Sequence, residues 1–96
     1  MRPSEPMAAR LESVRAVIAR HPVGNPRVFG SVARGEDDEK SDLDLLADPN
    51  EKASLFDLAG LEQELSDLLG VRVDVLTPGA VGPRIAASVY RDARPL

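Results

Sequence analysis

The sequence lacks cysteine altogether and has no long run of apolar residues. Without cysteine, neither a disulfide framework nor a thiolate metal site can form, and a reducing compartment suits such a chain. Residues 1–4 carry no apolar signal segment, and no apolar stretch approaches the roughly 18 residues that a membrane-spanning helix needs. We therefore expect a cytoplasmic protein without a membrane anchor.

The chain also has fewer basic residues than acidic ones. The 12 Lys and Arg residues are outnumbered by 16 Asp and Glu residues, so the formal net charge is -4. Proteins that bind nucleic acid draw affinity from Lys and Arg side chains that neutralise phosphates, so direct binding to nucleic acid is not expected. A phosphate-bearing ligand would need a metal ion or a local basic group. The length of 96 residues predicts a single domain over residues 1–96, small enough to benefit from a partner subunit.

Three segments show the apolar periodicity of amphipathic helices. The first lies at the N-terminus, and its helix is predicted to be capped by Ser4. The second begins with a capping-box spacing at Ser54 and carries a leucine stripe over residues 55–69 that is mostly core. The third lies near the C-terminus and is expected to place Ile85 and Val89 against the core.

Shorter segments show the alternation of strands or the composition of turns. Residues 24–26 read Gly-Asn-Pro and predict a turn, and residues 27–29 predict a short strand after it. Alternating patterns predict strands at 42–47 and 71–76. The order of elements predicts an α/β or α+β fold, in which a small mixed β-sheet has helices packed on one face.

Three aspartates occupy one face of the two alternating strands. Asp42 and Asp44 alternate with leucines and so point the same way, and Asp74 alternates with valines. If the strands are neighbours, the three carboxylates share a face, where two of them about 4 Å apart repel by roughly 4 kcal/mol at an effective dielectric near 20. Such a cluster shifts its pKa values or recruits a cation. Oxygen ligands without His or Cys suit Mg²⁺ or Mn²⁺ rather than zinc.

Gly30 and Ser31 lie where a strand turns into a short helix. The backbone N–H groups there and the Ser31 hydroxyl can face phosphate oxygens. Arg34, one helical turn later, is a second candidate for phosphate contact, although an arginine on an exposed turn is an equally good interpretation. The acidic residues 36–39 are expected to form a solvated loop.

These residues resemble a known signature. Gly30-Ser31, ten further residues and then Asp42-Leu43-Asp44 is similar to the motif of the DNA polymerase β-like nucleotidyltransferase superfamily. The fuller stretches GSVARGEDDEKSDLDLL and VDVLTPGAVGPRI resemble the minimal nucleotidyltransferases encoded beside HEPN-domain proteins as toxin–antitoxin pairs. The resemblance covers nearly the whole chain and implies the palm fold of that superfamily.

The resemblance also implies roles for residues. ATP would be the substrate, and two divalent ions would stabilise the attacking and leaving oxygens of an in-line displacement that releases pyrophosphate. The implied catalytic and metal-binding residues are Asp42, Asp44 and Asp74, and the implied nucleotide-binding residues are Gly30, Ser31 and Arg34. The implied function is that of an antitoxin, which transfers AMP to a tyrosine hydroxyl of a partner HEPN ribonuclease toxin and assembles with it.

Two other hypotheses remain open. In the first, the protein neutralises a HEPN toxin by direct binding and its nucleotide site is vestigial, although the intact motif argues against such decay. In the second, the acceptor is RNA or a small molecule such as an aminoglycoside. The acidic balance and the lack of an additional helical domain to shape an acceptor site weaken this hypothesis.

Overall fold

Four strands form one mixed sheet in the computed structural model, which describes residues 1–96. The strand order is β3-β2-β1-β4, with β1 antiparallel to β2 and β4, and β2 parallel to β3. The predicted α/β class with a mixed sheet is confirmed. The elements are α1 (Ser4–Ala9), α2 (Leu11–Ala19), β1 (Val23–Phe29), α3 (Gly30–Arg34), β2 (Leu43–Pro49), α4 (Leu55–Leu69), β3 (Val73–Leu76), the 3-10 helix η1 (Pro78–Ala80), α5 (Pro83–Asp92) and β4 (Arg94–Pro95).

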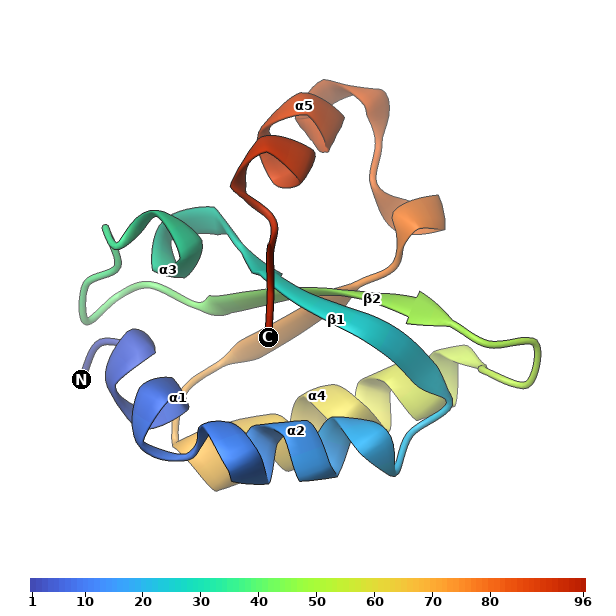
Figure 1. Ribbon diagram of the computed structural model, residues 1–96, viewed down its shortest axis with the longest axis horizontal. Coiled ribbons are helices and arrows are strands. Elements are labelled where there is room, and N and C mark those ends of the chain that lie inside the picture. The colour runs from blue at the N-terminus through green and yellow to red at the C-terminus, as the bar shows by residue number, and fades with distance from the viewer.

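The main core lies between the sheet and the helices α2 and α4, which run side by side along one face (Figure 1). Leu43 and Leu45 of β2 are almost completely inaccessible there. They pack among buried valines and leucines of the two helices, including Val14, Leu61 and Leu65. Full burial of such a side chain contributes about 1.5–3 kcal/mol, so this face accounts for much of the hydrophobic stabilisation.

The opposite face of the sheet carries a smaller apolar cluster beneath α5. Phe29, Leu46 and Val89 are buried together in it. Figure 1 shows α5 on the side of the sheet away from α2 and α4, so helices lie on both faces of the sheet, and the predicted placement of the helices on one face is wrong for α5. Val89 is buried as predicted, but Ile85 is 44% exposed, because only the C-terminal half of α5 rests on the sheet cluster.

The N-terminal helix differs from the prediction in two ways. It is interrupted at Arg10, which separates α1 from α2. Pro3 occupies the cap position without a side-chain cap, while the Ser4 backbone N–H donates to Asp37 Oδ2 at 2.9 Å. Asp37 is therefore buried rather than solvated. Burial by itself raises the pKa of Asp37, but the hydrogen bonding with Ser4 outweighs it and lowers the pKa below its ordinary value.

Strand β1 begins earlier than predicted, because the expected turn at residues 24–26 is part of the strand. The pairing of β1 with β2 shifts register between Gly24 and Arg27, and Asn25 adopts a φ of 48° there. An irregular ladder of this kind tolerates glycine and proline, which a regular strand does not. The chain also adds β4, a two-residue strand that pairs with Arg27 and Val28 and that was not predicted.

Helix α4 confirms the predicted capping box. The Asp57 backbone N–H donates to Ser54 Oγ at 3.3 Å, and the Ser54 backbone N–H donates to Asp57 Oδ2 at 2.9 Å. The leucine stripe is wrong at its first position, since Leu55 is 82% exposed and the core cluster reaches the helix only at Leu58. None of the helices combines the length and apolarity that crossing a membrane requires.

Candidate functional site

The turn between β1 and α3 brings the backbone against an aspartate of β2. Gly30 has a φ of +74°, a left-handed conformation that glycine adopts without steric cost. A Cβ atom at this position would lie 2.6 Å from Asp44 Oδ2. The position therefore requires glycine for its backbone conformation and for the close approach of the carboxylate. Ser31 follows at once, half-buried in the first turn of α3.

Three aspartates gather beside this turn. Asp44 is the register partner of Asp74 across the parallel strands β2 and β3, and directly paired residues point to the same face of a sheet. Asp42 lies two residues before Asp44 and acts on it as a nearby negative charge. The structure thus brings together the three aspartates that the alternation placed on one face, and their roles in binding and catalysis stay predictions.

Asp44 is the most strongly perturbed carboxyl group of the molecule. Burial, which is the largest effect, and the negative charges of Asp74 and Asp42 raise the pKa of Asp44 from 3.8 to about 6. The positive charges of Arg34 and Arg72 act in the opposite direction. A carboxyl pKa raised by neighbouring carboxylates signals a repulsion that a bound cation would relieve.

Arg72 is the nearest cation on the strand side of the cluster. Its Nε atom lies 3.5 Å from Asp74 Oδ1 and 3.9 Å from Asp42 Oδ2. The arginine side chain is 73% exposed, so each ion pair contributes at most about 1 kcal/mol. With this arrangement, no three carboxylate or imidazole groups lie close enough to one another to hold a metal ion.

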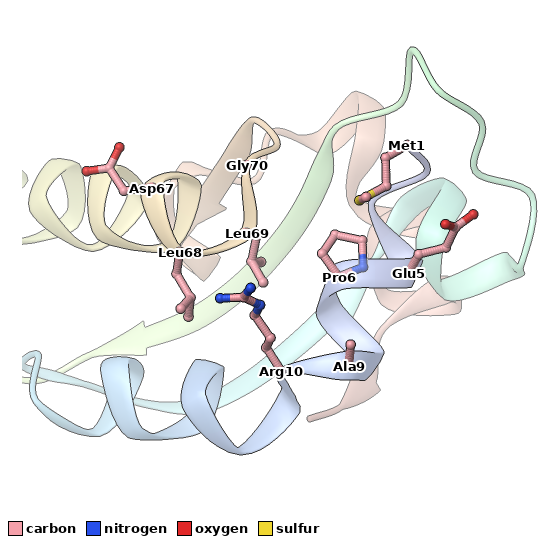
Figure 2. Close-up of a pocket in the computed structure, with 9 residues that line it drawn as sticks. All are labelled: Met1, Glu5, Pro6, Ala9, Arg10, Asp67, Leu68, Leu69 and Gly70. Atoms are coloured by element: carbon pink, nitrogen blue, oxygen red, sulfur yellow. The ribbon is translucent and has the colours of Figure 1, made fainter.

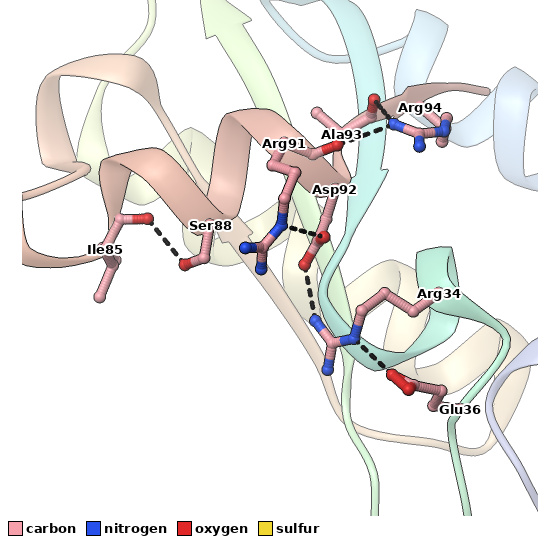
Figure 3. Close-up of polar contacts among 8 residues, drawn as sticks. All are labelled: Arg34, Glu36, Ile85, Ser88, Arg91, Asp92, Ala93 and Arg94. Carbon is pink, nitrogen blue, oxygen red and sulfur yellow. Dashed lines mark hydrogen bonds and ion pairs between the residues drawn. The ribbon is translucent and has the colours of Figure 1, made fainter.

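Arg34 is engaged by protein carboxylates. Its Nη1 atom donates to Asp92 Oδ2 at 2.6 Å and its Nε atom donates to Glu36 Oε1 at 2.7 Å (Figure 3). The guanidinium thereby joins α3 to α5. A contact between Arg34 and a nucleotide remains a prediction, and it would compete with these two hydrogen bonds.

Asp92 is a residue that the sequence analysis missed. It is 6% exposed, one of only two buried charged residues, and it also accepts a hydrogen bond from Arg91 Nε at 3.4 Å. The signal was its position three residues after Val89, which places an acidic group on the inward face of an amphipathic helix. An inward charge of this kind indicates a buried ion pair.

The larger of two surface hollows is not lined by Asp42, Asp44 or Asp74. It has a volume of about 630 Å³ and lies between α1 and the C-terminal end of α4, where Arg10, Asp67 and Leu68 are among its lining residues (Figure 2). None of the six predicted site residues lines this hollow. Asp42, Asp44 and Asp74 lie instead on a part of the sheet that neither hollow encloses.

Comparisons of sequence give one consistent family. The model of the nucleotidyltransferase domain matches residues 12–95. A "putative protein adenylyltransferase" of Methanocaldococcus jannaschii is 39% identical over 77 residues, which are 80% of this chain and 83% of the relative. The protein adenylyltransferase MntA of Thermococcus cleftensis is 37% identical over 90 residues, and the match covers 85% of this chain and 91% of the relative.

Solved structures agree with the sequence comparisons. A structure described as a "putative minimal nucleotidyltransferase" has a TM-score of 0.84 and 48% identity, and the match covers 97% of this chain and 95% of the other. A toxin–antitoxin structure with AMP-PNP has a TM-score of 0.75 at 16% identity, with 88% and 69% covered, and shows the fold alone. With a family match over most of its length and relatives of this similarity, the chain belongs to the nucleotidyltransferase domain family, as a minimal nucleotidyltransferase enzyme.

Proposed function

We propose that the protein is an antitoxin that transfers AMP from ATP to a tyrosine hydroxyl of a partner HEPN ribonuclease toxin. The proposal depends most on the contact between the Gly30 turn and Asp44, with Asp74 in direct register beside it. This contact joins a turn suited to phosphates to a cluster of carboxylates. The names of two relatives support adenylyl transfer to protein, and a toxin–antitoxin complex shares the fold.

The donor set suits a hard divalent cation. By type, three carboxylates without His or Cys match the ligands of Mg²⁺ or Mn²⁺, so we propose that Asp42, Asp44 and Asp74 bind the metal, although they do not lie close enough together to hold an ion in the present arrangement. In the present arrangement, Arg72 supplies positive charge to Asp42 and Asp74. When bound, the metal ions would neutralise charge on the attacking and leaving oxygens of the displacement.

The protein's own groups have separate tasks in this proposal. The N–H groups at the Gly30 turn and the Ser31 hydroxyl bind the β- and γ-phosphates. The tyrosine oxygen forms a bond to the α-phosphorus while the bond from that phosphorus to the oxygen bridging to the β-phosphate breaks, so pyrophosphate leaves. Asp74, on the outer of the two strands, accepts the proton of the hydroxyl.

The open position of the cluster favours a protein as the acceptor. No hollow encloses Asp42, Asp44 or Asp74, so a small acceptor would find few walls to hold it. The formal net charge of -4 disfavours an RNA acceptor, because the phosphates would be repelled. A partner protein brings its own surface and completes the acceptor side of the site.

The test is transfer of label from ATP labelled at the α-phosphate to the toxin encoded by the adjacent gene, in the presence of Mg²⁺. We expect label on a toxin tyrosine, and we expect its loss in Asp42→Ala and Asp44→Ala. Asp67→Ala is the matched control, since Asp67 is exposed on α4 and bonds only to Gln63.

Other outcomes identify the alternatives. Neutralisation of the toxin by Asp42→Ala combined with Asp44→Ala, without any label, would show an antitoxin that acts by direct binding. Label found on RNA or on a small molecule, but not on the toxin, would move the acceptor to another class. Wild-type protein that neither binds ATP nor transfers label contradicts the proposal.

A further inference from the structure

Helix α3 cannot fix its own direction. It has only five residues, too few to be stable alone, and it leaves β1 through Gly30, a residue type whose backbone is sterically less restricted than that of the others. Val32 attaches one side of α3 to the main core. The direction of the Gly30–Ser31 turn therefore depends on what holds the other end of the helix.

Arg34 holds that end. It is the last residue of α3, and its planar guanidinium bonds Asp92 and Glu36 at the same time, from Nη1 and Nε (Figure 3). The bond to Asp92 is the more important one, because Asp92 is buried, whereas Glu36 is 61% exposed. A charged hydrogen bond with one partner removed from solvent is stronger than an exposed pair.

Asp92 lies on a segment that is itself fixed to β1. Val89, one turn earlier in α5, packs against Phe29 and Leu46. Two residues after Asp92, β4 begins and pairs with Arg27 and Val28 of β1. A closed loop of contacts thus runs from β1 through α3, across the ion pair to α5, and through β4 back to β1.

We propose that Asp92 is a positioning residue for nucleotide transfer: through Arg34, it fixes the direction of α3 and therefore of the Gly30–Ser31 turn that receives the triphosphate. Asp92 touches no reacting atom in this role. The inference rests on the proposed function for its effect on the reaction. The proposal also predicts that this contact keeps α3 ordered when no substrate is bound.

The first variant is Asp92→Asn, which removes the charge and keeps the size. We expect KM for ATP to rise roughly tenfold with kcat nearly unchanged, since one charged hydrogen bond that orients the turn is lost. Hydrogen exchange of the backbone amides at 32–35 should become faster in the protein without nucleotide. Asp67→Asn, an exposed acid on α4, is the matched control and should change neither quantity.

The second variant is Arg34→Lys, which keeps the positive charge but cannot bond both carboxylates in the same way. We expect it to raise KM and speed exchange as Asp92→Asn does. The double variant should have no higher KM and no faster exchange than Arg34→Lys alone, because both changes break the contact between Arg34 and Asp92.

Three results would overturn the inference. One is a lower melting temperature of Asp92→Asn with unchanged KM and unchanged exchange at 32–35, which indicates structural support alone. Another is a double variant in which the effects of Asp92→Asn and Arg34→Lys on KM add in full. The third applies if Asp92→Asn does not fold: unchanged KM and unchanged exchange in Arg34→Lys would then contradict the inference. Wild-type protein without transfer would refute the proposed function, while the exchange measurement would still test the contact.

Discussion

The two faces of β2 differ in character, although one alternating sequence forms both: one face is apolar and the other is acidic. Leu43 and Leu45 point to the face under α2 and α4 and are almost fully buried. Asp42 and Asp44 point to the other face, where burial and like charges raise the pKa of Asp44 to about 6. One face therefore contributes stability, while on the other face the burial of Asp44 and the repulsion between carboxylates lower it.

The apolar face should give the largest effect on stability. Leu45→Ala should lower the free energy of unfolding by about 2–5 kcal/mol, because it removes a side chain that is 1% exposed and leaves a cavity. Chemical denaturation measures this loss. At low temperature, transfer activity per folded molecule should remain near that of the wild type. An equal loss of activity would mean that the two faces are not separable.

The contact between the turn and Asp44 should give a smaller loss of stability and a clear loss of activity. Gly30→Ala places a Cβ atom 2.6 Å from Asp44 Oδ2 and forces alanine to a φ of +74°. We expect a loss of about 1–2 kcal/mol in the free energy of unfolding and weaker binding of ATP, measured by denaturation and by nucleotide titration. Gly79→Ala is a control, since nothing lies within 4 Å of its added Cβ. Normal ATP binding by Gly30→Ala would contradict the assignment of the turn.

The acidic face should gain stability when its central charge is removed. The folded-state pKa of Asp44, about 6, lies above the unfolded value of 3.8, so this group's stabilisation is complete below pH 4 and is lost as pH rises through 6. In EDTA at pH 7 to 8, Asp44→Asn should therefore stabilise the protein by on the order of 1 kcal/mol after allowance for partial exposure. Melting temperatures across pH 4 to 8 measure it. A wild type and variant that differ equally at pH 4 and pH 8 would refute this explanation.

The smallest effect is expected where the leucine stripe leaves the core. Leu55→Gln should change the free energy of unfolding by less than about 0.5 kcal/mol, because the side chain is 82% exposed. Chemical denaturation measures this change, and Leu61→Ala, at a buried position on the same helix, gives a large loss for comparison. A large loss at Leu55 would show that this turn of α4 is covered in solution.

Local pattern was enough to predict much of the fold and of the candidate site. The period of two in β2 and β3 placed the three aspartates on one face, and the structure pairs Asp44 with Asp74. The capping box at Ser54 required only three residues of local sequence, and it is present. By contrast, β4 was missed because two residues carry no periodicity, and the break at Arg10 was missed because apolar spacing continues across it.

By itself, the sequence determined the turn at Gly30, the alternating strands β2 and β3 and the shared face of their aspartates, because backbone conformation and side-chain direction follow from residues close in the chain. Only the tertiary structure decided the partners of the charged groups. Arg34 pairs with Asp92 across 58 residues and the Ser4 N–H pairs with Asp37 across 33. Charges on loops and helix ends have no period to reveal their partners, and the contact that forms depends on how the packed elements place the chain.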